Sequence, residues 1–273
     1  MLSDTSNSGI HFQLRVRRSN FANVPDPRFS SFEVPFEPGM SVLDALLYAK
    51  EKIDHSIAIR YSCRMASCGS CGMKINGIPK LACYTQVAEY NNRPTITVEP
   101  LDHYPVVRDL VTDFEGFFQT HKSIHPYLIR RDTQEQETSE SEYEQSSSEL
   151  DEFLQFSYCI KCGLCNAACP TLATDPLFTG PQALAQAYRY SADSRDEGQA
   201  ERISSVDTEH GVWRCHFAGA CSFVCPKGVD PALGIQHLRR LTLLHKQNSG
   251  APLMPKRSSL KPRDEERLSR ALQ

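Results

Sequence analysis

The amino-acid sequence indicates an α+β protein in which a small mixed sheet packed on a helix precedes a region of short helices. Apolar residues alternate with polar ones in the first third of the chain, recur at helical spacing after residue 153, and are scarce in a polar stretch between the two. Alternation is typical of half-buried strands, and helical spacing is typical of amphipathic helices. We therefore expect a first domain at 1–125, a polar acidic linker at 126–152, a helical domain at 153–250 and a flexible tail at 251–273.

Short segments carry the predicted elements of the first domain. Apolar residues occupy every second position at 12–16 and at 32–36, which predicts two strands. The segment 41–47 begins with Ser-Val-Leu-Asp, a capping-box sequence, and continues with leucines on one helical face. At 73–77 two apolar residues precede Asn-Gly, a strong signal for a type I′ hairpin. A strand at 96–98 is expected to close the sheet.

The second domain is expected to contain short helices joined by cysteine-rich loops, with little or no sheet. Pro181 precedes apolar residues at helical spacing, and Pro231 precedes a leucine-rich run that ends at Leu244. Because proline is favoured at the first helical position, each proline is expected to begin a helix. We interpret the leucine-rich run as a core helix, with a membrane-surface helix as the alternative. No apolar run in the sequence approaches the ~20 residues that cross a bilayer.

Composition and charge exclude several classes of protein. The chain has 30 Lys and Arg against 33 Asp and Glu, which leaves no electrostatic footprint for nucleic acid. The N-terminal residues form neither a basic nor an apolar segment, so we expect neither secretion nor an organellar transit peptide. The cysteine count is 11, an odd number that argues against a fully paired disulfide framework. In a reducing compartment, clustered cysteines favour metal binding or chemistry.

The first cysteine group has the spacing of a plant-type [2Fe–2S] site, with three cysteines in one loop and a fourth further on. Such a loop can point backbone N–H groups at the sulfur atoms, and Gly69 and Gly72 allow close approach of the backbone. A structural zinc site also accepts four thiolates and is the alternative. With the sheet, this loop predicts a β-grasp plant-type [2Fe–2S] ferredoxin domain. Its expected ligands are Cys63, Cys68, Cys71 and Cys83.

Two further cysteine runs predict a bacterial-type ferredoxin domain. The first, at 159–170, has the C-x2-C-x2-C-x3-C-P spacing, whose fourth cysteine ligates the other cluster in two-cluster proteins. The second, at 215–226, has Ala218 where its second cysteine is expected. Exchange of the fourth cysteines leaves one site with four thiolates and one with three. The expected ligands are Cys159, Cys162, Cys165 and Cys225 for [4Fe–4S], and Cys169, Cys215 and Cys221 for the other cluster.

The three-thiolate site is expected to hold [3Fe–4S], because a cluster corner without a protein ligand tends to lose its iron. A [4Fe–4S] cluster with a non-protein ligand at that corner is the alternative. Together the three ligand sets use all 11 cysteines. The sequence contains no glycine-rich dinucleotide-binding motif and no recognisable Ser/His/Asp or paired-carboxylate arrangement of catalytic residues. We therefore predict no catalytic residue in this chain. Three clusters therefore indicate an electron-transfer chain that serves two-electron chemistry on another subunit.

These motifs, in this order, resemble the iron–sulfur subunits of succinate dehydrogenase and fumarate reductase. The resemblance runs from about Phe12 to about His245 and is clearest at 62–72 and 225–231. The segment 211–231 is more similar to the bacterial fumarate reductases than to the mitochondrial type. It implies a flavoprotein partner that interconverts succinate and fumarate on covalent FAD and lies against the first domain. It also implies a membrane anchor, with or without haem, that helps to bind quinone. The implied electron order is FAD, [2Fe–2S], [4Fe–4S], [3Fe–4S], quinone.

The resemblance further implies two quinone contacts, Lys227 directly after a cysteine-proline pair and His216 beside a cysteine of the three-thiolate set. The alternatives are a solvated or helix-capping cation for Lys227 and a local hydrogen bond for His216. Ubiquinone-linked members carry tryptophan where this chain has Thr174, so menaquinone is an alternative to ubiquinone.

We therefore predict the iron–sulfur subunit of a succinate dehydrogenase (quinone) complex of the tricarboxylic acid cycle and respiratory chain. We expect it to be peripheral on the cytoplasmic face of the cell membrane, held there by anchor subunits. A fumarate reductase that runs in the quinol-oxidising direction is the first alternative. A free-standing multicluster ferredoxin and a zinc-stabilised interaction module are alternatives from other classes.

Overall fold

The computed structural model describes residues 10–19, 28–90, 95–140 and 142–250, which divide into two compact units. Within the described ranges, the first unit takes the chain up to 101 together with 106–112, and the second takes 102–105 and the chain from 113 onward. This division falls earlier than the expected boundary at 125, because helix α2 (Glu115–Ser123) packs against α8 (Pro181–Ser191) of the second unit. The tail expected at 251–273 lies outside the described residues.

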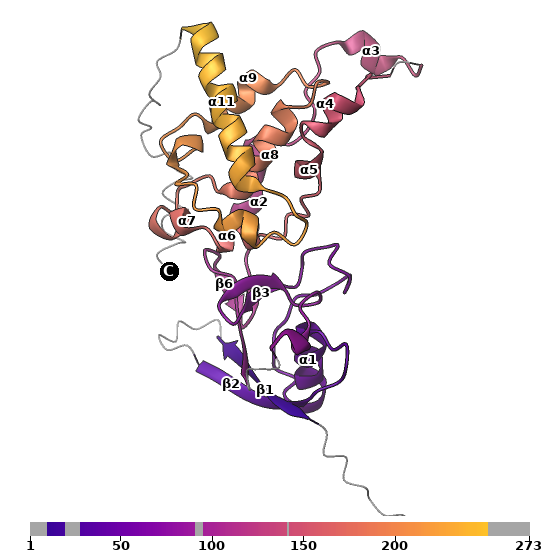
Figure 1. Ribbon diagram of the computed structural model, residues 1–273, viewed down its shortest axis with the longest axis vertical. Coiled ribbons are helices and arrows are strands. Elements are labelled where there is room, and N and C mark those ends of the chain that lie inside the picture. The colour runs from indigo at the N-terminus through magenta and orange to yellow at the C-terminus, as the bar shows by residue number, and fades with distance from the viewer. Residues whose placement is uncertain (1–9, 20–27, 91–94, 141, 251–273) are drawn as a thin grey trace, which may run out of the picture. The chain divides into compact units, whose positions relative to one another are not determined.

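A five-stranded mixed sheet with the order β2-β1-β5-β3-β4 forms the frame of the first unit (Figure 1). β1 pairs antiparallel with β2 and parallel with β5, so the strand expected to close the sheet lies instead at its centre. A separate two-stranded pair, β6 and β7, follows. The strands are β1 (His11–Arg18), β2 (Arg28–Pro35), β3 (Gly72–Ile75), β4 (Ile78–Leu81), β5 (Thr95–Glu99), β6 (Val106–Arg108) and β7 (Val111–Thr112).

The predicted capping box begins helix α1 (Val42–Tyr48). The Ser41 hydroxyl accepts the Asp44 N–H at 3.2 Å, and the Asp44 carboxylate accepts the Ser41 N–H at 3.0 Å. These contacts satisfy N–H groups that have no partner inside the helix. The predicted leucines of α1 are buried, and a π-helical turn, η1 (Ala49–Ile53), extends the helix.

The predicted type I′ hairpin joins β3 to β4. Asn76 and Gly77 both have positive φ, 48° and 83°, as that turn requires. Asn76 also ties the turn to the neighbouring strand, because its N–H donates to the Thr97 carbonyl and its side-chain oxygen accepts the Thr97 N–H, both at 2.8 Å. A 3₁₀ turn, η2 (Val87–Tyr90), precedes β5.

The regular elements described in the second unit are all helices, which confirms the α+β organisation (Figure 1). Both predicted proline-led helices are present, α8 and α11 (Pro231–Ser249), and they pack against each other. Leu184 and Leu238 are fully buried in the core that these helices share. The remaining elements are α5 (Leu154–Ser157), α6 (Leu164–Ala167), α7 (Pro170–Thr174), α9 (Gln199–Val206), η3 (Val212–Arg214) and α10 (Ala220–Phe223).

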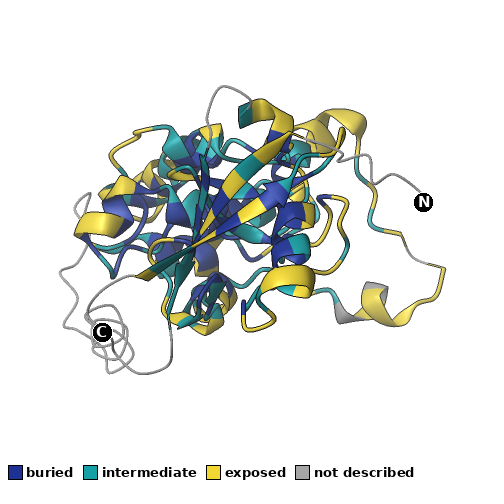
Figure 2. Ribbon diagram, turned by 90° about the horizontal axis from the view of Figure 1, so that it is seen from below, coloured by how far each residue is buried: buried dark blue, intermediate teal, exposed yellow. Residues whose placement is uncertain are grey.

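The region predicted as a polar linker contains two short helices, α3 (Thr133–Glu137) and α4 (Ser147–Asp151). Their described side chains are exposed (Figure 2). Polar contacts hold the segment to the rest of the second unit, since Arg130 donates to the Arg195 carbonyl and Gln145 donates to the Asp193 carboxylate, both at 3.0 Å. Among the helices that the structure describes, none combines the length and apolarity needed to span a bilayer.

Candidate metal centres

In the first unit, the loop from Cys63 to Cys71 directs backbone N–H groups at cysteine sulfur atoms. The Sγ atom of Cys63 accepts three of them, from Met65, Ser67 and Cys68, at 3.4, 3.3 and 3.2 Å. Because an N–H group stabilises a negatively charged acceptor, this arrangement suits a set of thiolates. The other contacts run from Cys63 and Ser70 to Cys68 Sγ, both at 3.5 Å, from Cys83 to Cys71 Sγ at 3.5 Å, and from Ala66 to Cys83 Sγ at 3.4 Å.

Left-handed backbone produces the curvature of this loop. Arg64, Ala66 and Gly69 have φ of 56°, 55° and 75°. Glycine adopts such angles without a steric penalty, whereas the other two residues are strained there. Successive N–H groups in a backbone of this kind face one side and form a concavity that binds anions. The strained backbone of this loop is therefore the same backbone that directs the N–H groups at sulfur.

The environments of the cysteines in this loop differ. Burial raises the pKa of the Cys71 thiol to about 12. Burial also opposes ionisation of Cys68, but hydrogen bonds from Ser70 and Cys63 outweigh it and lower the pKa of Cys68 to about 6. Cys68 is exposed whereas Cys71 is buried, so the loop presents one edge of the cysteine group to solvent.

The second unit contains a cavity that four cysteines line. The turn at Gly163 shapes this cavity, with φ of 79°, and a Cβ there would lie 2.6 Å from the Tyr104 hydroxyl oxygen. Burial raises the pKa of Cys162 to about 12. The cysteines are Cys159 and Cys162 from the loop before α6, Cys165 from α6, and Cys225 from the loop after α10.

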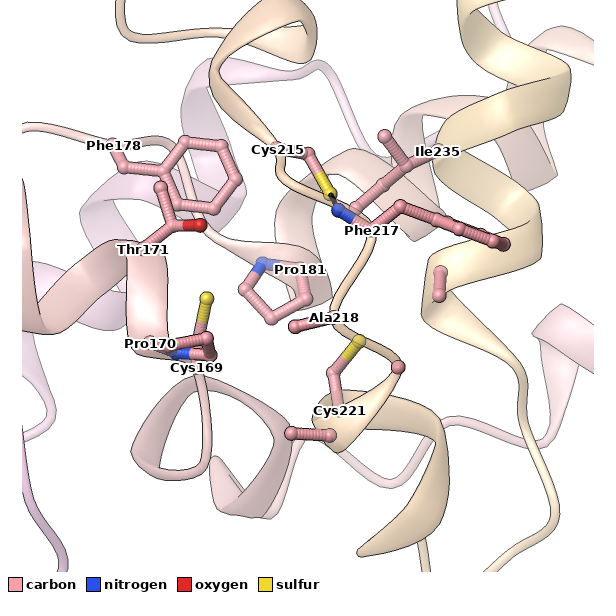
Figure 3. Close-up of a pocket in the computed structure, with 13 residues that line it drawn as sticks. Cys169, Pro170, Thr171, Phe178, Pro181, Cys215, Phe217, Ala218, Cys221 and Ile235 are labelled. Carbon is pink, nitrogen blue, oxygen red and sulfur yellow. Dashed lines mark hydrogen bonds between the residues drawn. The ribbon is translucent and has the colours of Figure 1, made fainter.

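A second cavity is lined by the three cysteines Cys169, Cys215 and Cys221. Figure 3 shows their sulfur atoms and the Ala218 methyl group directed into the same space. An alanine side chain offers no donor to a metal. Burial raises the pKa of Cys221 to about 11. Apolar side chains, among them Phe178 and Ile235, complete the lining.

The two residues predicted to contact quinone lie in different surroundings. Lys227 lines the four-cysteine cavity, not the three-cysteine one. His216 is exposed and lines neither of these two cavities. Thr174 stands where the ubiquinone-linked members have tryptophan. It is exposed on α7, and its hydroxyl donates to the Thr171 carbonyl at 3.1 Å.

One functional candidate, Gln182, was not found from the sequence. Gln182 and Gln186 lie one turn apart on α8, both are buried, and both line the four-cysteine cavity. Gln182 contacts His121, a buried residue of α2. A pair of polar residues four positions apart among the alanines and leucines of a predicted core helix is the signal that could have revealed the glutamines.

The donor sets fit thiolate-bound clusters. All 11 cysteines are free, and soft thiolate ligands are those that iron–sulfur clusters use. In the described ranges, no three His, Cys, Asp or Glu side chains converge closely enough to hold a single metal ion. The cysteines of the second unit instead line two cavities.

Comparison with known proteins gives matches along both units. A family model described as a 2Fe-2S iron-sulfur cluster binding domain matches residues 13–119, and one described as a 4Fe-4S dicluster domain matches residues 155–229. The chain is 47% identical over 219 residues to the fumarate reductase iron-sulfur subunit of Mycobacterium tuberculosis, covering 80% of this chain and 87% of that protein. It is 44% identical over 230 residues to the subunit of the same name from Haemophilus influenzae, covering 81% and 89%.

A solved structure of the Mycobacterium smegmatis Sdh1 complex in the apo form contains a chain of the same fold. The TM-score is 0.78 at 24% sequence identity, over 90% of this chain and 100% of that chain.

Proposed function

The chain belongs to the family of iron–sulfur subunits of fumarate reductase and succinate dehydrogenase, and we propose that it is the electron-transfer subunit of a succinate:quinone oxidoreductase. The grouping of seven cysteines around two cavities of one helical unit, four around one and three around the other, carries this proposal. Dicarboxylate chemistry takes place on a partner flavoprotein in this proposal. Electrons leave that partner through this chain.

The protein's part in this function is to hold and shield three sets of thiolates. Bound clusters would accept and pass on single electrons, which connects a flavin that exchanges two electrons with a membrane quinone. In the first unit, backbone N–H groups would stabilise the charge of the sulfur ligands. In the second unit, burial would exclude water from them. The sets are Cys63, Cys68, Cys71 and Cys83 for [2Fe–2S], Cys159, Cys162, Cys165 and Cys225 for [4Fe–4S], and Cys169, Cys215 and Cys221 for [3Fe–4S].

Ala218 supports [3Fe–4S] in the three-cysteine cavity. Its methyl group faces the space between the three cysteines, where a four-iron cluster would need a fourth ligand (Figure 3). A [4Fe–4S] cluster with a non-protein ligand at that corner is the alternative. The two forms differ in spin, so low-temperature electron paramagnetic resonance of the oxidised protein distinguishes them.

The proposed partners are a flavoprotein subunit with FAD, one or more membrane anchor subunits with or without haem, and quinone at the anchor. We place the chain on the cytoplasmic face of the membrane, where the anchor would hold it. Exposed aromatic residues within the third cysteine group support an anchor contact, since Phe217 is 56% and Phe223 81% exposed. Lys227 and His216 are the proposed quinone contacts, with menaquinone or ubiquinone as the quinone.

Fumarate reduction by quinol is the second candidate direction. The names of the relatives from Mycobacterium tuberculosis and Haemophilus influenzae favour it. The two directions are distinguished by comparing succinate:quinone and quinol:fumarate turnover of the purified complex. A higher rate of fumarate reduction with the native quinol would show that fumarate reduction, not succinate oxidation, is the physiological direction.

The cluster assignment is tested on the complex purified without air. We expect iron, acid-labile sulfide, and three distinct spin signals that respond to titration with succinate and a quinol. Zinc without acid-labile sulfide would overturn the proposal and show that the chain is a structural zinc protein. A chain that purifies alone and fully loaded with clusters would instead favour a free-standing ferredoxin.

A further inference from the structure

A buried polar pair lies beside the four-cysteine cavity. Gln182 is 2% exposed and His121 is 7% exposed. The Gln182 side-chain nitrogen lies 3.2 Å from Nδ1 of His121 and 4.0 Å from Sγ of Cys159. The amide nitrogen therefore bridges a histidine from α2 and a cysteine of the larger ligand set.

Hydrogen-bonding capacity fixes the orientation of this amide. A thiolate is an acceptor only, so the amide nitrogen, not the amide oxygen, is the atom suited to face Cys159. The nitrogen carries two hydrogens, one for each neighbour. The Gln182 oxygen has no hydrogen-bond partner among the described residues, although it is buried. A buried carbonyl oxygen without a hydrogen-bond partner destabilises the fold. The side chain nevertheless adopts the orientation that directs its N–H group at the cysteine sulfur.

His121 is in the state that this bridge requires. Burial, together with the nearby charge of Lys161, lowers the pKa of His121 to about 4. The ring is therefore neutral near pH 7, and its Nδ1 accepts the Gln182 hydrogen. The main chain of Gln182 is also restrained, because its backbone N–H donates to the Asn166 side-chain oxygen at 3.2 Å. His121 thus contacts the side-chain amide, and Asn166 holds the backbone that carries it.

We propose that Gln182 is a positioning residue that raises the reduction potential of the cluster in the four-cysteine cavity, and that His121 keeps its amide N–H directed at Cys159. This inference rests on the proposed function, since it requires a [4Fe–4S] cluster at that cavity. Reduction adds negative charge to a cluster and its sulfur ligands. A donor aimed at a ligand sulfur stabilises the reduced form more than the oxidised form, and so raises the potential.

The test is a redox titration of the purified complex, followed by the spin signal of the reduced [4Fe–4S] cluster. Gln182→Leu keeps the side chain's approximate volume and removes the N–H group. We expect its midpoint potential to fall, so that the ratio of reduced to oxidised cluster at a fixed ambient potential decreases several-fold. His121→Leu should produce a smaller decrease. The double variant should fall no further than Gln182→Leu, because the histidine acts through the glutamine.

Gln186→Leu is the matched control. Gln186 lines the same cavity one helical turn away, but its side-chain nitrogen donates to the Phe156 carbonyl at 2.8 Å. We expect its potential to stay at the wild-type value. An unchanged potential in a loaded Gln182→Leu protein, or an equal decrease in Gln186→Leu, would overturn the inference. If the wild-type complex lacked the [4Fe–4S] signal, the proposed function itself would fail.

Discussion

The side chain at position 218 sets the number of possible ligands around the three-cysteine cavity. Ala218→Cys adds a thiol where the alanine methyl group now faces the three cysteines (Figure 3). We expect the variant to retain a fourth iron, to lose the [3Fe–4S] spin signal in the oxidised protein, and to titrate at a lower potential. Electron paramagnetic resonance of the isolated protein measures all three effects.

Ala218→Ser is the control for that substitution, because it adds similar volume without a thiolate. It should keep the [3Fe–4S] signal. An unchanged signal in a folded, iron-loaded Ala218→Cys protein would mean that position 218 does not face the open corner of the cluster.

Lys227 tests the quinone assignment at a single side chain. Lys227→Ala is expected to slow succinate:quinone turnover several-fold while succinate oxidation by an artificial dye stays nearly unchanged. The reason is that a cation near the quinone stabilises charge on its oxygens, whereas the dye accepts electrons elsewhere. Parallel assays with quinone and dye give the comparison. Because Lys227 lines the four-cysteine cavity, equal loss of both activities would assign it a structural role there.

Among the secondary-structure elements, the β3–β4 hairpin depends on its left-handed turn. Gly77 has φ of 83°, and a Cβ built there would meet no atom within 4 Å. The penalty of Gly77→Ala is therefore backbone strain alone, about 1–2 kcal/mol. We expect the opening free energy of β3 and β4 to fall by that amount, as measured by amide hydrogen exchange in the intact chain.

Gly116 provides the matched control for the hairpin. It lies in α2, a Cβ there also meets nothing within 4 Å, and its φ is not in the left-handed region. Gly116→Ala should therefore stabilise its helix by roughly 0.5–1 kcal/mol. Unchanged exchange of the β3 and β4 amides in Gly77→Ala would contradict the type I′ conformation.

Elements with a local signal could be predicted from the sequence, and their long-range arrangement could not. Ser41 with Asp44 gives the start of α1, and Pro181 gives the start of α8. Alternation at Ile96 and Val98 predicts a strand, but the same alternation is compatible with an edge strand and with a central strand of the sheet. The central place of β5 comes from its parallel pairing with β1, far away in the chain.

The same distinction applies to the candidate site. Part of the grouping of cysteines follows from spacings of a few residues, because Cys63, Cys68 and Cys71 belong to one short segment, and so do Cys159, Cys162 and Cys165. The contact between His121 and Gln182 joins positions 61 residues apart. No pattern within either segment indicates it. The packing of α2 on α8 creates the contact, and the expected boundary at 125 assigned those two helices to different domains.

Considered as a whole, the molecule has two units whose cysteines lie differently relative to their cores. In the first unit, Leu14 and Val98 are fully buried in the sheet, while Cys68 is exposed at a loop. In the second unit, Cys169 belongs to the buried core, and Cys159, Cys215 and Cys225 pack against it. A core built around bound metal takes part of its folding free energy from that metal. The second unit should therefore depend more strongly on its clusters than the first.

Removal of iron from the purified protein by a chelator under reducing conditions tests this dependence. We expect amides of α8 and α11 to exchange at least about tenfold faster, a loss of about 1.4 kcal/mol, while amides of β1 and β5 keep their protection. Iron and sulfide added back should restore the helical protection. Equal loss in both units would show that the sheet also depends on its cluster loop. Unchanged protection in α8 and α11 would contradict the view that the seven cysteines of the second unit build its core around metal.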